Sequence, residues 1–303
     1  MARNMPRTIH RILAALTALA LSSAAAARPA LTWTLLNVPP FTIPVNGLPT
    51  DGIMDQVLRL LMQELPQYEA RYAVVNIARA IKMLDVGEPA CYTAAIPTPE
   101  RERRYFSTLT TLNPPLQVVV RASMLGQLPR NEAGEVLIER LLVEHRLRGL
   151  VVDQRSYTPA LDVLLAKYRA SAGLVTVSSS NVGSNVLRML SAGRADYSLE
   201  HDAVLAYNQA GNPQGLGREA LVSVPIAGLS PLYSAILCPR TAWGRERIIA
   251  IDAALSRMAQ GKAYRALLDR WRTPQTVQHY RAAFDEFYRA RATPNGPEHY
   301  PLP

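Results

Sequence analysis

The segment from Thr98 to Ser107, TPERERRYFS, holds a dense group of residues that could do chemistry. It sets Arg101, Arg103 and Arg104 among two glutamates, after a proline and before an aromatic pair. A guanidinium presents paired N–H donors in one plane, which matches the two oxygens of a carboxylate. The cluster therefore indicates a nucleic-acid contact, a solvated helix face, or one ligand-binding arginine among bystanders.

The distribution of charge argues against the first of these readings. The formal net charge is +9, but the basic residues are interleaved with acidic ones, as in RERIIAIDAALSR. No run of basic residues with interleaved aromatics occurs, so a nucleic-acid partner is not expected. A basic surface that faces an acidic envelope or anionic solutes fits the composition better.

Metal chemistry is not expected either. The chain has two cysteines, Cys91 and Cys238, and five scattered histidines, none in a ligand-like spacing with a cysteine. A structural metal site needs about four ligands held close together, and these residues show no such spacing. We therefore expect no metal and no cofactor, whereas two cysteines in an oxidising compartment are enough for one disulfide.

The N-terminal residues indicate export. Arg3, Arg7 and Arg11 precede a short apolar run at 12–21, which ends in two serines and four alanines. This order predicts a signal peptide over residues 1–27 and a periplasmic protein; the alternative is an amphipathic helix of the mature chain. Removing its three arginines lowers the formal charge from +9 to +6. No later stretch resembles a membrane span.

The elements that position the cluster alternate between strand and helix. Leu31, Trp33 and Leu35 alternate with threonines, which predicts a strand with one buried face. Helical and strand patterns then alternate at short spacing, which predicts parallel βαβ units. They follow at 53–65, 68–75, 76–84 and 90–96. The pattern starts again after 114–123 and continues to residue 211, and helices are expected at 245–260, 263–271 and 276–294.

Two α/β units without a flexible linker predict two lobes with a ligand cleft between them, because open α/β sheets bind ligands at the carboxyl ends of their strands. The aromatic residues of the last helix follow a stripe that favours burial. The final eight residues, with three prolines, are expected to be unstructured.

Five segments in order resemble the type II periplasmic solute-binding proteins, specifically family 3, which serves polar amino-acid ABC importers. These segments are VPPFTIPVNGLPTDGIMDQVLRLL, GEPACYTAAIPTPERERRYFS, LRGLVVDQRSY, SAGRADYSLEHD and IIAIDAALSRMAQGKAYRALLDRW. The resemblance spans residues 31–272 and implies a divergent member. The implied fold is an α/β clamshell whose two lobes each have a mixed, mostly parallel sheet and are joined by two hinge crossovers.

The resemblance also implies a domain plan and a function. Lobe 1 would comprise residues 28–117 and 226–303, the latter with a C-terminal helical extension, and lobe 2 residues 118–225. The implied protein is a monomer and not an enzyme. It would close over a small polar or anionic, amino-acid-like solute and deliver that solute to an ABC permease.

The resemblance places a carboxylate-binding arginine in the opening cluster. Arg101, third after Thr98, matches the family's Thr-x-x-Arg motif and would bind the ligand's α-carboxylate. Arg103 and Arg104 lack this match and are expected on a solvated helix face, balanced by neighbouring glutamates.

Other ligand contacts follow from the same comparison. Phe41 would pack on the ligand, or else in the core, and Thr93 matches a small hydroxyl position. Ala94 and Ile96 stand where amino-acid binders keep serine, so hydrogen bonds to the ligand head group are lost.

In the second lobe, Ser156 precedes a predicted helix, where backbone N–H groups and a hydroxyl would bind the carboxylate. Its alternative role is a helix N-cap. Tyr157 and Arg155 are bulkier than the family's residues and would narrow the pocket or add contacts.

The family's ammonium-binding acid would fall at His201. A shift of one residue restores a carboxylate at Glu200, or less directly at Asp202; the alternative is a solvated helix start. The implied division into lobes also puts Cys91 and Cys238 on strands of one sheet, which predicts a disulfide. The alternative is two buried free thiols.

Two other functions stay open on this fold. One is a receptor that presents its ligand to a membrane sensor, with the helix at 276–294 as a partner surface. The other is an enzyme similar to periplasmic dehydratases of cyclic diene acids, in which Glu200 or His201 opposite Arg101 would act as acid and base.

Overall fold

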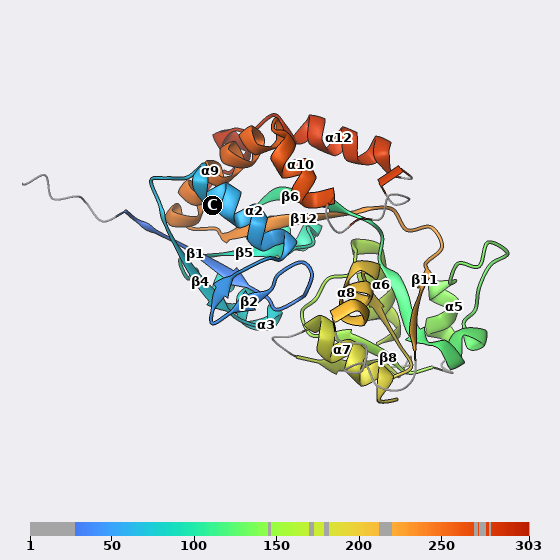
Figure 1. Cartoon of the computed structure of the whole chain (residues 1–303). Coiled ribbons are helices and arrows are strands. Elements are labelled where there is room, and N and C mark those ends of the chain that lie inside the picture. Colours follow the sequence, from blue (N-terminus) through green and yellow to red (C-terminus); the bar gives the residue numbers. More distant parts are fainter. Residues whose placement is uncertain are drawn as a thin grey trace, which may run out of the picture.

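The computed structural model describes residues 28–302, except 145–146, 170–172, 179–181, 212–219, 270–271, 273–276 and 279. The predicted signal peptide lies outside the described residues. The described chain forms two α/β lobes, each built on a five-stranded sheet (Figure 1). Within the described residues, no helix is long and apolar enough to span a membrane.

Lobe 1 is the part of the chain built on the first sheet. In order across the sheet, its strands are β4 (Glu69–Val74), β1 (Ala30–Leu35), β5 (Ala90–Ala95), β12 (Leu232–Pro239) and β6 (Tyr105–Asn113). β1 runs parallel to β4 and β5, whereas β12 runs antiparallel to β5 and β6. Leu31, Trp33 and Leu35 of β1 are fully buried as predicted, but Thr34 is only 1% exposed, so the expectation of a single buried face is wrong because both faces of the sheet are covered.

Helices cover both faces of this sheet. One face packs against α2 (Ile53–Gln63), α9 (Ala242–Ala259), α10 (Lys262–Asp269) and α12 (Arg281–Arg291), and the other against α3 (Ile77–Asp85) (Figure 1). Successive strand residues face opposite sides, so Cys91 joins the first core and Tyr92 the second. A small ribbon of β2 (Pro44–Val45) and β3 (Leu48–Pro49) precedes α2.

Lobe 2 is built on the second sheet. Its strands, in order, are β11 (Leu221–Pro225), β7 (Gln117–Arg121), β10 (Tyr197–Glu200), β8 (Gly149–Val152) and β9 (Val175–Val177). Its helices are η1 (Ala122–Gln127), α5 (Ile138–Val143), α6 (Pro159–Tyr168), α7 (Val182–Ser191) and α8 (Asp202–Gly211). β8 is parallel to β9 and β10, and β7 is antiparallel to β10 and β11.

The chain passes between the two sheets twice, at 114–116 and at 226–231. β7 begins and β11 ends beside each other, with Gln117 opposite Pro225, so the two crossovers lie together. Side chains also touch across the lobes: Asn76 Nδ2 of lobe 1 donates to Ser178 Oγ of lobe 2 over 3.2 Å. The lobes are therefore in contact around the space between them.

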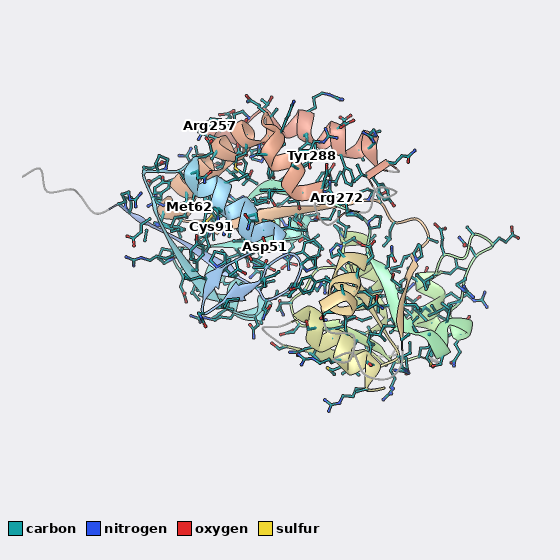
Figure 2. All side chains as sticks on the ribbon, viewed as in Figure 1. Asp51, Met62, Cys91, Arg257, Arg272 and Tyr288 are labelled. Atoms are coloured by element: carbon teal, nitrogen blue, oxygen red, sulfur yellow. A yellow bond between two sulfur atoms is a disulfide. The ribbon has the colours of Figure 1, made fainter. Side chains whose placement is uncertain are left out.

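The disulfide between Cys91 and Cys238 is confirmed. It joins the neighbouring strands β5 and β12, and both cysteines are fully buried. Figure 2 shows Cys91 inside lobe 1, below α2. The bond thus ties the N-terminal part of lobe 1 to the strand that returns from lobe 2.

The expectation of an unstructured C-terminus is wrong for the described residues 296–302. Tyr300 is 1% exposed, and its ring contacts Phe106 at 6.1 Å between centroids. Arg245 Nε donates to the Tyr300 carbonyl over 2.6 Å, and Asn295 Nδ2 donates to the Tyr300 hydroxyl over 3.1 Å. One aromatic anchor therefore outweighs the prolines around it. The predicted aromatic stripe is confirmed at Phe284, Phe287 and Tyr288, which are buried against lobe 1.

Candidate ligand-binding cleft

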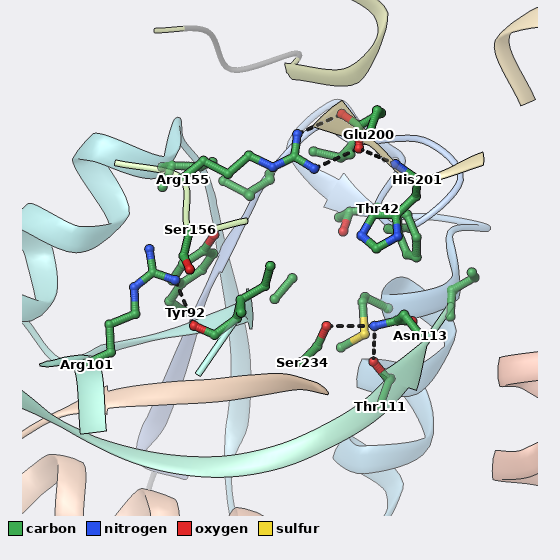
Figure 3. Close-up of a pocket in the computed structure, with 18 residues that line it drawn as sticks. Thr42, Tyr92, Arg101, Thr111, Asn113, Arg155, Ser156, Glu200, His201 and Ser234 are labelled. Atoms are coloured by element: carbon green, nitrogen blue, oxygen red, sulfur yellow. Dashed lines mark hydrogen bonds and ion pairs between the residues drawn. The ribbon is translucent and has the colours of Figure 1, made fainter. Parts of the chain in front are cut away.

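A cavity of about 90 Å³, partly open to solvent, lies between the lobes. Lobe 2 contributes Arg155, Ser156, Glu200 and His201 to its wall. The polar groups from lobe 1 are Thr42, Tyr92, Arg101, Thr111, Asn113 and Ser234 (Figure 3). Much of the remaining wall is apolar and includes Leu36, Val38, Phe41, Ile53, Met54 and Ile77.

Arg101 lies on the short helix α4 (Pro99–Arg104). Thr98 caps the helix by accepting a hydrogen bond from Arg101 N over 3.2 Å, and Pro99 fits its first position. The Arg101 guanidinium donates to the Ile96 carbonyl over 2.9 Å and to the Gln154 carbonyl, in lobe 2, over 2.8 Å. Arg101 thus links the lobes at one side of the cavity.

Arg101 brings a positive charge to the wall of the cavity. No carboxylate of the described residues forms an ion pair with its guanidinium, and its two known bonds go to neutral carbonyls. A guanidinium has five N–H donors, so others remain for a ligand. By contrast, Arg103 and Arg104 are exposed, and Arg104 pairs with Glu100 over 2.9 Å on the solvated face, as predicted.

Glu200 lines the cavity but already has a partner. Its carboxylate accepts two bonds from Arg155, each 2.7 Å long, and one from His201 N over 3.0 Å. Glu200 is fully buried, and the Arg155 guanidinium stacks over the Tyr157 ring at 4.9 Å. Burial acts to raise the pKa of Glu200, but the Arg155 charge and hydrogen bonds outweigh it and hold the pKa below its ordinary value. Glu200 is therefore ionised.

The N-terminus of helix α6 in lobe 2 already binds a carboxylate of the protein. Thr158 caps α6, accepting from Leu161 N over 3.0 Å, so Ser156 does not have the N-cap role. Ser156 lines the cavity, yet its hydroxyl donates to the Asp162 carboxylate, which also accepts from Tyr157 N over 2.8 Å. The expected anion-binding donors thus bind a carboxylate of the protein itself.

Three predicted residues do not line the cavity. Thr93 is fully buried and donates to the Thr34 carbonyl over 3.0 Å. Thr98 acts as the cap of α4, and the Tyr157 hydroxyl accepts from Val152 N over 2.9 Å in the lobe 2 core. Phe41 does line the cavity, where its ring meets that of His201 edge-on at 5.0 Å.

His201 lines the cavity as a neutral group. Burial and the Arg155 charge outweigh the nearby acids and lower its pKa to about 4. Its ring also has a hydrogen bond with the backbone of Pro114, in the first crossover. Asp202 is the first residue of α8; its carboxylate accepts a hydrogen bond from Ala203 N over 2.8 Å, and it does not line the cavity.

Sequence reasoning missed the polar group at the crossover. Asn113 Nδ2 donates to Thr111 Oγ1 and Ser234 Oγ, both over 2.9 Å (Figure 3). Thr111 and Ser234 are opposite each other on β6 and β12. These residues could have been found from their positions in the sequence, because Thr111 and Asn113 precede one predicted crossover and Ser234 follows the other, and the ends of the two strands must meet there. Tyr92 could have been found from strand alternation, since it points opposite to the buried Cys91.

Comparisons with known proteins give the fold. The sequence matches no protein-family model and no curated protein. Solved structures do match over most of the chain. One comes from work on glutathione import through a cystine ABC importer of Streptococcus mutans: it is 15% identical, has a TM-score of 0.62, and the match covers 81% of this chain and 95% of that one.

Two further structures show the range of functions among the neighbours. An ancestral arginine-binding protein bound to arginine is 18% identical, with a TM-score of 0.61 and coverage of 81% of this chain and 99% of that one. The VFT2 domain of Bordetella pertussis BvgS is 19% identical, with a TM-score of 0.56, and covers 89% of this chain and 100% of that one. The chain therefore has the two-lobed fold of the type II periplasmic binding proteins.

Proposed function

We propose that this protein is an exported solute-binding protein that closes its lobes over one small polar or anionic solute. The observation that carries the proposal is the cavity between the lobes, whose wall includes Arg101, a positive charge with no acidic partner among the described residues. In a partly dried cavity, a charge-assisted bond from a guanidinium to a carboxylate is stronger than on a surface. The cavity is thus suited to an anion.

The binding mechanism is closure about the two crossovers. Arg101 reaches the Gln154 carbonyl of lobe 2, so the contact forms only when the lobes approach. A ligand that touches both lobes stabilises the closed state in proportion to its differential affinity for that state. His201 couples the crossover at Pro114 to the cavity wall.

We further propose that the protein works outside the cytoplasm and delivers its bound solute to an ABC importer. The buried disulfide fits an oxidising compartment. The fold is shared with amino-acid and cystine binding proteins of ABC systems. The N-terminal pattern of residues 1–27 fits export through a signal peptide.

Thermal unfolding of the protein lacking residues 1–27, against amino acids, peptides, carboxylates and polyamines, tests the proposal. A ligand that binds only the native state raises the Tm. We expect one carboxylate-bearing compound to stabilise the wild type and the control Arg103→Ala, which removes an exposed arginine of the same helix, but not Arg101→Ala. If carboxylates stabilise all three proteins equally, Arg101 is not the ligand contact; if none of the compounds raises the Tm, the binding function is wrong.

A sensor domain is the second candidate. The BvgS domain covers more of this chain than the ABC-related neighbours do, and a histidine kinase sensor domain is also similar. The aromatic face of α12 packs on lobe 1, so it does not offer the partner surface considered from sequence. Transport of the ligand by a reconstituted importer would support delivery; a ligand-dependent kinase response would support sensing.

Catalysis has less support. A precursor of cyclohexadienyl dehydratase is among the neighbours, and it is itself described as an amino-acid-binding protein. Glu200 is held by Arg155 in an ion pair, so it is not free to act as a base. Recovery of the bound ligand unchanged after prolonged incubation checks this assignment.

A further inference from the structure

The described wall of the cavity has no unpaired carboxylate that could bind a ligand cation. Among the described residues that line it, Glu200 is the one carboxylate. Both of its oxygens accept bonds from Arg155, and one also accepts from His201 N. The Arg155 side chain is 12% exposed and that of Glu200 is fully buried, so water screens the pair poorly. Figure 3 shows the two-pronged guanidinium directed at the carboxylate.

The charge that remains in the cavity is positive. Arg155 and Glu200 cancel, His201 is neutral at ordinary pH because of its lowered pKa, and Arg101 lacks an acidic partner among the described residues. Much of the remaining wall is apolar, with Leu36, Ile53 and Ile77 among its residues. A ligand with one negative charge and an apolar body matches this distribution.

We propose that Arg155 is a specificity-determining residue, which occupies Glu200 and thereby makes the cleft select small monocarboxylates that lack an ammonium group. This inference rests on the proposed binding function and narrows its ligand class. A ligand ammonium would either displace Arg155 from two charge-assisted bonds or enter unpaired, beside two guanidinium groups. Both are costly in a water-poor site.

The planar fork of Arg155 explains why the pair is hard to open. Two parallel N–H···O bonds fix both partners in one geometry, whereas a lysine would supply a single point charge. The Tyr157 ring below the guanidinium adds a cation–π contact at 4.9 Å. The alternative is that the pair serves only to stabilise lobe 2, in which case it would not discriminate between ligands.

Matched ligands that differ only by the α-amino group separate these readings. Calorimetric titration of the wild type compares isocaproate with L-leucine and hydrocinnamate with L-phenylalanine. We expect at least one carboxylate to bind on the order of tenfold or more tightly than its amino counterpart. This comparison needs no variant, so it does not depend on how well a mutant folds.

Two variants then assign the selectivity to Arg155. In Arg155→Met the Glu200 carboxylate is released, and we expect the preference to shift toward the amino acid by on the order of tenfold. Arg155→Met leaves a buried charge unpaired and is prone to unfold, so Arg155→Gln/Glu200→Gln is the second variant. It removes both charges, and the preference for the carboxylate is expected to fall several-fold with the carboxylate still bound.

Each outcome is decisive. If ligands bind but no carboxylate binds the wild type more tightly than its matched amino acid, the inference is wrong while the binding function stands. Unchanged selectivity in a folded variant gives Arg155 a structural role only. If no member of any pair binds, the inference fails, and the wider panel of peptides and polyamines decides separately whether the protein binds solutes at all.

Discussion

Glu200 and Arg155 lie on different elements of lobe 2, at the end of β10 and in the turn before α6, and they meet in the cavity. Four predicted ligand residues line the same cavity, namely Phe41, Arg101, Ser156 and Glu200. Their positions could be predicted because each lies in a segment that resembles the binding-protein family, at a turn, a helix start or a strand end. The pairing of Glu200 with Arg155 could not, because 45 residues separate them and only the folded sheet brings them together.

His201 gives a prediction for pH. Its pKa is lowered from 6.5 to about 4, so between these values the unfolded chain binds more protons than the folded one. The free energy of unfolding should therefore fall as the pH falls through this range, by about 1–2 kcal/mol between pH 7 and pH 5. Urea unfolding across this range, with His201→Gln as control, measures the effect. An equal slope in the wild type and the variant would contradict it.

At the scale of elements, the strands and helices of both lobes follow their sequence periodicity, but the C-terminal segment does not. Prolines and a lack of apolar periodicity predicted an unstructured end. The burial of Tyr300 against Phe106 depends on a pocket made by distant residues, which no local pattern reveals. A single tertiary contact therefore overrides the local preference.

Tyr300→Ala tests this anchoring. Removing a fully buried aromatic ring should lower the free energy of unfolding by about 3 kcal/mol, measured by chemical denaturation. Leu302→Ala is the matched control, because that side chain is 49% exposed, and little change is expected. If both variants are as stable as the wild type, the tail does not contribute to the fold.

The Cys91–Cys238 bond gives a second prediction for elements. It closes a sequence separation of 147 residues between β5 and β12. Alkylation of the denatured protein without reductant should add no mass. The double variant Cys91→Ala/Cys238→Ala should be about 2–4 kcal/mol less stable to denaturant. Two alkylated thiols in the untreated protein would show that the bond does not form.

At the scale of the whole molecule, the two-lobed fold was predictable because two α/β units without a linker need two sheets and a shared cleft. The lobe boundaries at 117 and 225 stay a prediction. The chain passes from one sheet to the other at nearby positions, 114–116 and 226–231. What the sequence could not supply is the charge of the cleft. That depends on which arginines find acidic partners after folding, and Arg101 does not among the described residues.

The most direct test of the account is calorimetric titration of the protein lacking residues 1–27 with the carboxylate that best raises its Tm. We predict one site per chain, loss of on the order of tenfold or more in affinity in Arg101→Ala, and wild-type affinity in Arg103→Ala. Equal affinity in Arg101→Ala would contradict the central claim that a monoanion binds in the cleft between the lobes against Arg101.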